Sequence, residues 1–223
     1  MQNKNVIDVT IVATQRAELL DRTLKSLIKQ MPMLPNIANA IINLDNTPIR
    51  DFYDSAIYLT VTNYLPIKIF MVSNQPSFCS AVKRVWCNTT AEYVLHLEDD
   101  WEFIRPLDIN WCMEEMANGN ADYIRFGKRK KILSEETKKV ALLPSLWRGD
   151  IVRNLACCMD SRYDPEKQLR YGFNVEIDDN LPRHIIDYPN GQCVKDIGRE
   201  WRESRKLAKW DKNNRGDITW SQM

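Results

Sequence analysis

The organisation of this chain is set by Tyr93–Phe103, YVLHLEDDWEF, an apolar run that ends abruptly in acid. The apolar part is mostly β-prone, which indicates a strand buried on both faces, as in a parallel sheet. Three carboxylates, Glu98, Asp99 and Asp100, follow at once. Adjacent carboxylates at a buried strand end repel one another unless a cation or hydrogen-bond donors hold them ionised.

Two interpretations of this acidic triplet are open. Mg²⁺ and Mn²⁺ prefer oxygen ligands and usually keep water or substrate phosphate in their remaining positions, so the triplet could belong to a metal-diphosphate site. Alternatively, it is a surface turn whose acids are solvated.

Composition excludes several classes of protein. At 223 residues the chain is long enough for one α/β domain, residues 1–223, but not for two full domains. Lys and Arg number 31 against 30 Asp and Glu, so the net charge of +1 gives no general attraction to nucleic acid or anionic membrane. No apolar run approaches the roughly 20 residues of a membrane span. Six cysteines without a CxxC pair favour a cytoplasmic protein with free thiols and no zinc site.

Glycine usage excludes two phosphate-binding motifs from the first half of the chain. There are only seven glycines, and the first is Gly119. The dinucleotide fingerprint and the P-loop both need glycines after an early strand, so that backbone amides can approach phosphate closely.

Hydrophobic periodicity predicts the order of elements in the first half. Strands are expected at 6–13, 40–44 and 67–72, and helices at 17–30 and 77–88, while 52–65 fits either. This order predicts an open, mostly parallel α/β sheet of the Rossmann-like kind, flanked by helices. Ligands of such sheets bind outside the carboxyl ends of the strands. Thr14–Arg16, Asp45–Asn46 and Glu98–Asp100 should therefore lie along one edge.

The second half is expected to be smaller and more irregular, with antiparallel elements. Patterning predicts helices at 107–117 and 150–158, strands at 123–126 and 140–147, and a solvated loop or hairpin at 128–131. Residues 161–180 are aromatic and acidic without a clean period. A short strand near Val194 and a charged helix reaching Trp210 end the pattern.

Val9–Arg16 with its helix, Leu44–Asn46 and Leu97–Trp101 together resemble the nucleotide-sugar-dependent glycosyltransferases of the GT-A fold, especially family 2. The similarity covers most of residues 6–126. Glu98–Asp100 resembles the DxD motif of these enzymes with Glu in first place, and Asp196–Gly198 looks like their C-terminal metal-ligand segment. The resemblance implies a nucleotide-sugar-binding half at 1–103 and an acceptor-binding half with a C-terminal helix at 104–223.

For the donor, the resemblance implies that Asp100 ligates a Mn²⁺ or Mg²⁺ that bridges the two phosphates. Asp196 would be a further metal ligand, with a turn or N-cap role as the alternative. The remaining implied contacts are to the nucleotide sugar: Glu98 to the ribose, Asp99 to the donor sugar or in a supporting hydrogen bond, Asp45 to the base N–H, and Thr14 and Arg16 along the pocket. An acid that accepts the base N–H favours a UDP-sugar, UDP-glucose or similar.

The chemistry of sugar transfer asks for further groups. Cations stabilise the leaving diphosphate, and Arg199 and Arg202 could supply them, or be ordinary helix-surface arginines. An inverting enzyme also needs a carboxylate that takes the proton from the acceptor hydroxyl. Glu176 is the preferred candidate, because Phe173 and Val175 suggest a drier setting that would raise the pKa of a carboxyl group, and Asp178 and Asp179 follow closely. Sugars stack on aromatic faces, and the candidate platforms are Trp101, Trp111, Trp147 and Tyr171, with a place in the hydrophobic core as the alternative for each.

The sequence thus predicts a metal-dependent hexosyltransferase that moves a hexose from a UDP-sugar to a hydroxyl of a small molecule or glycan. A non-catalytic module that binds sugar nucleotides or carbohydrate is an alternative. A nucleotidyltransferase is another, although such enzymes usually open with a glycine-rich phosphate loop that this chain lacks.

Overall fold

The computed structural model describes residues 6–31, 36–46, 54–127, 140–171, 175–189, 191–205, 207–211 and 218–222. In this part of the chain, a seven-stranded sheet in the order β3-β2-β1-β4-β7-β6-β8 forms the centre. Its strands are β1 (Val6–Thr14), β2 (Asn36–Asp45), β3 (Ile67–Ser73), β4 (Tyr93–Glu98), β6 (Tyr123–Arg125), β7 (Ser145–Arg148) and β8 (Ile185–Asp187).

The strand directions confirm the predicted sheet type. β1, β2, β3 and β4 are mutually parallel, β7 runs antiparallel to both β4 and β6, and β8 is parallel to β6. The sheet is therefore mixed but mostly parallel. The strand predicted to be buried, β4, lies at the middle of the sheet beside β1, which explains why it reads as a nearly continuous apolar run.

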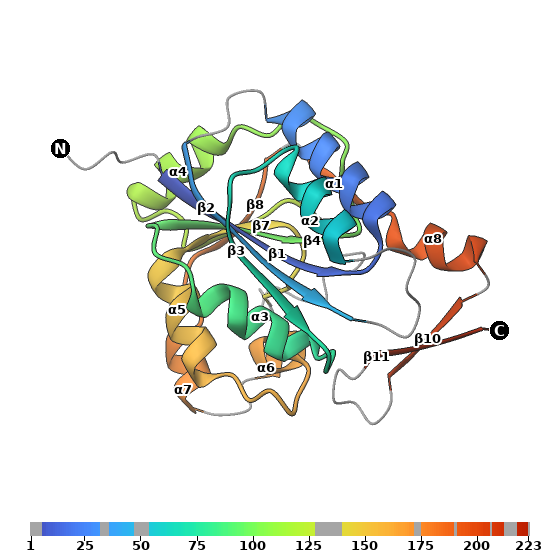
Figure 1. The fold of residues 1–223 in the computed structure, drawn as a ribbon. Coiled ribbons are helices and arrows are strands. Elements are labelled where there is room, and N and C mark those ends of the chain that lie inside the picture. The colour runs from blue at the N-terminus through green and yellow to red at the C-terminus, as the bar shows by residue number, and fades with distance from the viewer. Residues whose placement is uncertain are drawn as a thin grey trace.

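Helices cover both faces of the sheet (Figure 1). On one face lie α1 (Ala17–Gln30), α2 (Asp54–Thr62) and α4 (Ile109–Ala117); on the other lie α3 (Phe78–Cys87), α5 (Gly149–Cys158), α6 (Pro165–Tyr171) and α7 (Val175–Asn180). Each face has its own hydrophobic core. This is the layered arrangement that the alternation of strands and helices predicts.

The helix predicted at 17–30 is confirmed as α1. Leu20, Leu24 and Leu27 form its apolar stripe and are fully buried. The backbone N–H of Met31 donates to the carbonyl of Leu27 at 2.9 Å and closes the last turn. The position of α1 matters for the site, because its first turn follows directly from the carboxyl end of β1.

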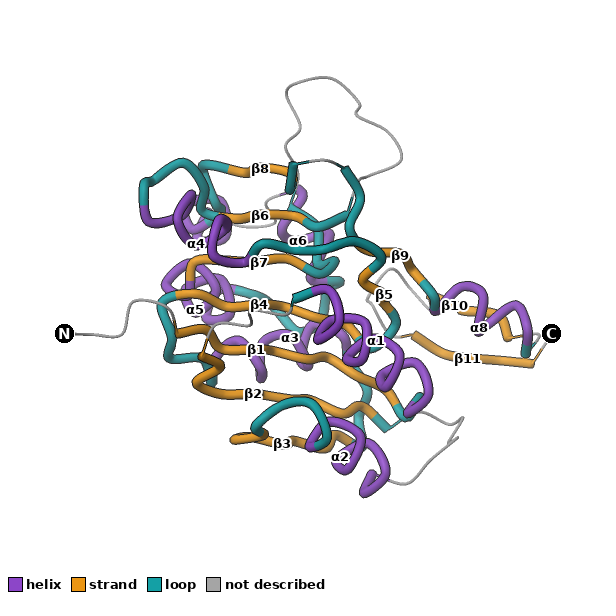
Figure 2. Tube along the Cα trace, turned by 90° about the horizontal axis from the view of Figure 1, so that it is seen from above, coloured by secondary structure: helices purple, strands orange, loops and turns teal. Residues whose placement is uncertain are grey.

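A second group of elements lies beyond the carboxyl ends of β1, β2 and β4 (Figure 2). β5 (Trp101–Phe103) pairs antiparallel with β9 (Val194–Asp196), and α8 (Gly198–Ser204) follows β9. β10 (Leu207–Asp211) and β11 (Ile218–Gln222) then form an antiparallel hairpin. The pairing of β5 with β9 carries residues from the C-terminal part of the chain to the end of β4.

Several predicted boundaries need correction. The helix expected to reach Trp210 ends at Ser204, and residues 207–211 form a strand because they pair with β11. The strand expected at 140–147 begins only at Ser145, directly after Pro144, which has no N–H to donate to a ladder. The ambiguous 52–65 segment contains α2, and 161–180 holds α6 and α7. The expected loop at 128–131 lies outside the described residues.

Within the described ranges, no helix has the length and apolar character required for a bilayer crossing.

Candidate active site

Three polar loops meet at the carboxyl edge of the sheet, as the sequence predicts. Thr14 at the end of β1 lies beside Asp45 at the end of β2, and Val12 of β1 lies beside Glu98 at the end of β4. The side chain of Gln15 donates from Nε2 to Oδ1 of Asn46 at 2.9 Å, which joins the first loop to the second. The edge of the parallel strands thus collects the groups that the sequence singled out.

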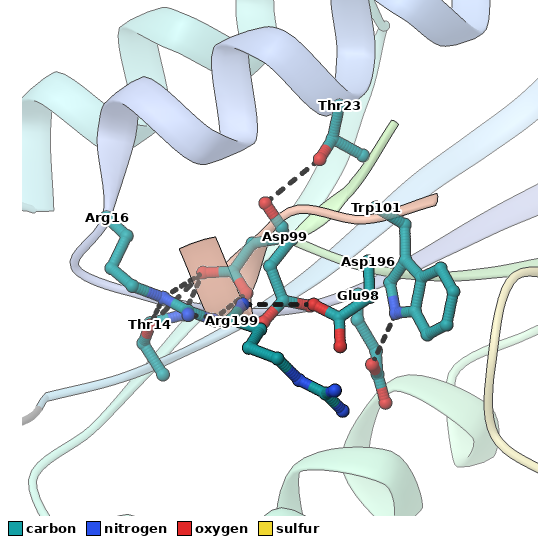
Figure 3. A network of polar contacts seen from close by, with 9 residues as sticks. Thr14, Arg16, Thr23, Glu98, Asp99, Trp101, Asp196 and Arg199 are labelled. Atoms are coloured by element: carbon teal, nitrogen blue, oxygen red, sulfur yellow. Dashed lines mark hydrogen bonds and ion pairs between the residues drawn. The ribbon is translucent and has the colours of Figure 1, made fainter. Parts of the chain in front are cut away.

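Asp99 is the buried centre of this edge, with 2% of its surface exposed (Figure 3). Its Oδ2 accepts from the backbone N–H of Thr14 at 2.9 Å, from the Thr14 hydroxyl at 3.1 Å and from Nε of Arg16 at 3.3 Å. Its Oδ1 accepts from Nη2 of Arg16 at 2.5 Å. Its backbone carbonyl accepts from the hydroxyl of Thr23 on α1 at 2.9 Å. Asp99 therefore takes the supporting role, which was one of its two predicted roles.

Arg16 shares one guanidinium between two carboxylates. Besides the contacts to Asp99, its Nη1 lies 3.2 Å from Oδ2 of Asp100. Burial alone lowers the pKa of Arg16, but the two carboxylates outweigh burial and raise it above its ordinary value. Burial raises the pKa of Asp99, while the guanidinium and the Thr14 amide oppose this shift. The single positive charge of Arg16 leaves the pair of acids with net negative charge.

Asp100 is held from the other side by the start of α8. Its backbone carbonyl accepts from the N–H of Ile197 at 2.9 Å. A Cβ at Gly198 would lie 2.1 Å from Oδ2 of Asp100, so only glycine permits this approach of the two segments. The guanidinium of Arg16 lies 5.6 Å from the ring centroid of Trp201, one turn further along α8. Asp100 thus sits between Arg16 and the backbone of α8.

Asp196 lies beside the same turn, because β9 pairs with β5 in the register Asp196 to Trp101. Its Oδ1 accepts from the backbone N–H of Arg199 at 3.2 Å, which is the turn role that the sequence left open for it. Oδ2 is not used in that bond. Asp196 therefore has a structural contact and, at the same time, a position next to Asp100.

Glu98 and Trp101 flank the turn on the strand side. Nε1 of Trp101 donates to Oε2 of Glu98 at 2.8 Å, and both side chains are partly exposed (Figure 3). An indole with one solvent-facing part fits the predicted use of Trp101 as a platform.

Asp45 is almost buried, with 5% of its surface exposed. Oδ1 accepts from Nδ2 of Asn43 at 2.8 Å, Oδ2 accepts from the backbone N–H of Ser77 at 3.0 Å, and Nη1 of Arg84 lies 3.7 Å from Oδ1. Burial raises the pKa of Asp45, and the three donors oppose the shift. Both oxygens that were expected to face a base are thus already hydrogen-bonded to the protein.

The three predicted bases stand apart from this cluster. Glu176, Asp178 and Asp179 are exposed on α7, which packs against α5 and α6 (Figure 1). The dry setting expected for Glu176 is wrong, since its side chain faces solvent. Phe173 lies outside the described residues, as does the side chain of Tyr171.

The prediction of Trp147 as an acceptor platform is wrong. Trp147 is fully buried, its ring centroid lies 4.1 Å from that of Tyr123 and 5.2 Å from that of Trp86, and its Nε1 donates to Ser145 at 2.8 Å. Strand β7 is central in the sheet, so its side chains enter the core. An aromatic side chain in such a strand has no face left for a ligand.

On α8, Arg199 is exposed and Arg202 is partly exposed. Sequence reasoning named Gly198 only as part of the Asp196–Gly198 segment and missed Trp201. The role of the glycine depends on the approach of Asp100, which no local pattern reveals. Trp201 was hidden among the charged residues of its helix.

The donor chemistry of the site fits a hard divalent cation. Asp100 and Asp196 offer carboxylate oxygens, and Arg16 leaves negative charge in excess. Across the described residues no group of three or more His, Cys, Asp or Glu side chains gathers in a form that could hold a metal. Mg²⁺ commonly needs only one or two carboxylates, because substrate phosphates and water complete its shell. Asp100 and Asp196 are therefore the described residues that could hold such an ion if phosphate and water completed its shell.

Comparison by sequence finds no relatives: no protein-family model matches the chain, and no curated protein does. Comparison by structure does. Residues 1–349 of S. aureus TarS match with a TM-score of 0.60 at 13% identity, over 89% of this chain and 63% of that one. The mannosyltransferase PcManGT from Pyrobaculum calidifontis, solved with GDP-Man and Mn²⁺, matches with a TM-score of 0.59 at 12% identity, over 89% of this chain and 59% of that one.

A third match is glucosyl-3-phosphoglycerate synthase from Mycobacterium tuberculosis, with a TM-score of 0.57 at 13% identity over 91% of this chain and 75% of that one. The fold is that of the GT-A glycosyltransferases. This GT-A chain spans 63% of the TarS fragment, and TarS has also been solved with UDP-GlcNAc. Sequence identities of 12–13% establish only that this chain shares the GT-A fold. The donor and the acceptor have to be argued from the residues of the candidate site.

Proposed function

We propose that this chain is a metal-dependent glycosyltransferase that moves a hexose from a UDP-sugar to a hydroxyl acceptor. The observation that carries the proposal is the position of Asp100. It lies at the carboxyl end of the central strand β4, between Arg16 and the Asp196 segment, in a GT-A fold. Matched GT-A structures contain UDP-GlcNAc or GDP-Man with Mn²⁺, which supports a nucleotide-sugar donor.

In this proposal Asp100 and Asp196 would hold Mn²⁺ or Mg²⁺, which would supply positive charge to the leaving diphosphate. Asp99 and Thr14 keep Arg16 in place, and Arg16 orients Asp100. Glu98 faces the ribose, Asp45 lies on the base side, and Arg199 and Arg202 stand next to the phosphates.

On the acceptor side, the proposal rests on Trp101. An inverting reaction would also need a carboxylate that takes the proton from the acceptor hydroxyl. Glu176, Asp178 and Asp179 are the candidates from the sequence, but they lie on α7, apart from the Asp100 cluster, so none of them is assigned this role. Trp101 offers an aromatic face to the acceptor, as Tyr171 would. In the proposed division of the chain, residues 1–103 form the half that binds the nucleotide sugar and residues 104–223 form the half that binds the acceptor.

The test of this proposal is a thermal-shift measurement with UDP, GDP and CDP, each with and without Mn²⁺, followed by a search for nucleotide released from the corresponding sugar nucleotide. A ligand at about one hundred times its dissociation constant stabilises the folded state by about 2.7 kcal/mol, which gives a clear rise in melting temperature. Release of UDP from UDP-sugar supports the proposal. Binding without release would indicate a non-catalytic module.

The variant Asp100→Asn tests whether the metal binds at the proposed site. Asp100→Asn keeps the shape of the side chain but removes its charge, so we expect the Mn²⁺-dependent part of the shift to disappear while far-UV circular dichroism is unchanged. Glu102→Gln is the matched control, because Glu102 is on the adjacent β5 and pairs with Arg22 near the surface. No shift with any nucleotide would rule the proposal out. Diphosphate release from UTP and a sugar 1-phosphate would indicate a nucleotidyltransferase instead.

A further inference from the structure

The side chain of Gln15 has a buried oxygen that accepts no hydrogen bond from the described residues. Its side chain is 98% buried, since only 2% of the residue is exposed, and its Nε2 donates both to Oδ1 of Asn46 at 2.9 Å and to Oδ1 of Asp54 at 2.8 Å. Its Oε1 is buried and has no hydrogen-bond partner among the described residues. Buried polar atoms without a partner are rare in folded proteins, so each needs an explanation.

The orientation of the Gln15 carboxamide is fixed by its partners. An ionised carboxylate only accepts hydrogen bonds, so the atom that faces Asp54 must be the nitrogen. The orientation of the neighbouring amide follows from this, because the Gln15 nitrogen can only donate and so faces Oδ1 of Asn46, which leaves Nδ2 of Asn46 to donate to Oδ1 of Asn74 at 2.6 Å. The unpaired atom is therefore an oxygen, and it needs an N–H or O–H donor.

The place of this oxygen suggests the donor. Gln15 follows β1 and its partner Asn46 follows β2, so both lie at the carboxyl edge of the sheet, where these two strands end. Asp45, the residue expected to read the base, already accepts from Asn43, at 2.8 Å, and from Ser77, at 3.0 Å. The acceptor without a partner in these two loops is therefore the Gln15 oxygen rather than Asp45.

We propose that Oε1 of Gln15 accepts the ring N–H of the nucleobase and so sets the base specificity. This inference rests on the proposed function, a nucleotide-sugar donor, and deepens it. Uracil carries a donor at N3 and guanine carries one at N1, whereas cytosine and adenine carry acceptors at the corresponding ring positions at neutral pH. A site built around a buried acceptor rejects a ligand without the donor, because both acceptors are then left unpaired. The favoured class is thus a uridine or guanosine diphosphate sugar.

Entry of the base requires a local movement. Because 2% of Gln15 is exposed, a side chain next to it must give way before a base reaches Oε1. The contact between Asn46 and Asn74 is exposed and can open without breaking the core. Asp54 then keeps the carboxamide in its orientation while the base binds.

The experiment measures dissociation constants of UDP, CDP, GDP and ADP, with Mn²⁺, for the wild-type chain and for Gln15→Met. Methionine has nearly the length and volume of glutamine but no acceptor oxygen. We expect the wild type to bind UDP about 100-fold more tightly than CDP, or GDP about 100-fold more tightly than ADP. In Gln15→Met the same ratio of dissociation constants should fall to within about threefold, because the preferred nucleotide binds more weakly. Asp45→Asn, by contrast, should keep most of the preference.

A second measurement needs no variant. UDP methylated at N3 lacks the ring N–H, so we expect the wild type to bind it at least about tenfold more weakly than UDP, as it does CDP. If Gln15→Met keeps the wild-type ratio, or if N3-methylated UDP binds as well as UDP, the base inference is overturned while nucleotide binding stands. If no nucleoside diphosphate binds the wild type, the proposed function fails and the inference fails with it.

Discussion

At the scale of single residues, the ion pair of Arg16 and Asp99 is the most consequential contact of the site. Both side chains are buried, with 9% and 3% of their surfaces exposed, and Thr14 supplies two further hydrogen bonds. A buried pair of this kind contributes little relative to an apolar pair, but the loss of one partner leaves an uncompensated charge in the interior. Its value is therefore positional, since it holds the turn that carries Asp100.

Removal of the guanidinium should destabilise the whole chain. Arg16→Met keeps the apolar stem but leaves Asp99 unpaired, so we expect a loss of about 3–5 kcal/mol in the free energy of unfolding, measured by urea denaturation. Arg22→Met removes an exposed pair with Glu102 and should cost under about 1 kcal/mol. Arg16→Met combined with Asp99→Asn should recover part of the loss. Equal effects of the two single variants would show that burial of the pair is unimportant.

The sequence predicted which residues meet at this site, but not which of them are buried and hydrogen-bonded to the protein and which stay accessible. Thr14, Arg16 and the acidic triplet had to converge, because the carboxyl ends of neighbouring parallel strands share an edge. Which of two adjacent aspartates turns inward depends on the path of the turn after β4 and on donors from α1. Those groups are distant in sequence, so the buried role of Asp99 and the committed oxygens of Asp45 appear only in the fold.

At the scale of elements, the connection between β9 and α8 decides the position of Asp100. Gly198 starts α8 directly against the Asp100 carboxylate. The helix is only seven residues long, and its first residue has to be small. The element is therefore defined by its contact to the site rather than by its own helical pattern.

A methyl group at Gly198 should separate metal binding from folding. In Gly198→Ala the new Cβ would lie 2.1 Å from Oδ2 of Asp100, so the carboxylate or α8 has to shift. We expect the Mn²⁺-dependent rise in melting temperature with UDP to fall by at least half, while circular dichroism stays the same. Gly119→Ala is the control, since its Cβ would meet nothing within 4 Å and only the positive φ of 76° adds strain. An unchanged Mn²⁺ response in Gly198→Ala would contradict this role.

Elements with strong local patterns were predicted well, and those defined by distant pairing were not. α1 has a clear stripe and matches its predicted range at both ends. The helix expected to reach Trp210 gives way to β10, because β10 pairs with residues 218–222, and no local period reports that partner. Trp147 was misjudged for the same reason: the sequence shows an aromatic residue, but only the sheet order places it in the centre.

At the scale of the whole molecule, His96 on β4 connects the sheet to a helix that covers it, since it contacts both β1 and α3. It is fully buried on β4, and its Nδ1 accepts from Nε1 of Trp86 on α3 at 3.2 Å, which places the proton of the neutral ring on Nε2. The hydroxyl of Thr10 on β1 lies 3.1 Å from the same nitrogen. Burial lowers the pKa of His96 from 6.5 to about 3.

Global stability should therefore fall in mild acid. The unfolded chain takes up a proton near pH 6.5 but the folded chain only near pH 3, so this contribution is complete above pH 6.5 and is lost as the pH falls towards 3. At about 1.4 kcal/mol per pH unit, urea denaturation should show a loss of about 2 kcal/mol between pH 6.5 and pH 5. His96→Gln should remove most of this slope, and His184→Gln, at an exposed position, should keep it. A wild-type stability that is constant over this range would contradict the assignment.

The pairing of β5 with β9 also determines when, during synthesis of the chain, the candidate site can be completed. β1, α1 and β4 all lie within the first hundred residues, so a ribosome completes them first. The groups that enclose Asp100, from Val194 to Trp201, are added about a hundred residues later. During synthesis, the growing chain thus contains the central strands of the sheet before it contains the residues that enclose Asp100.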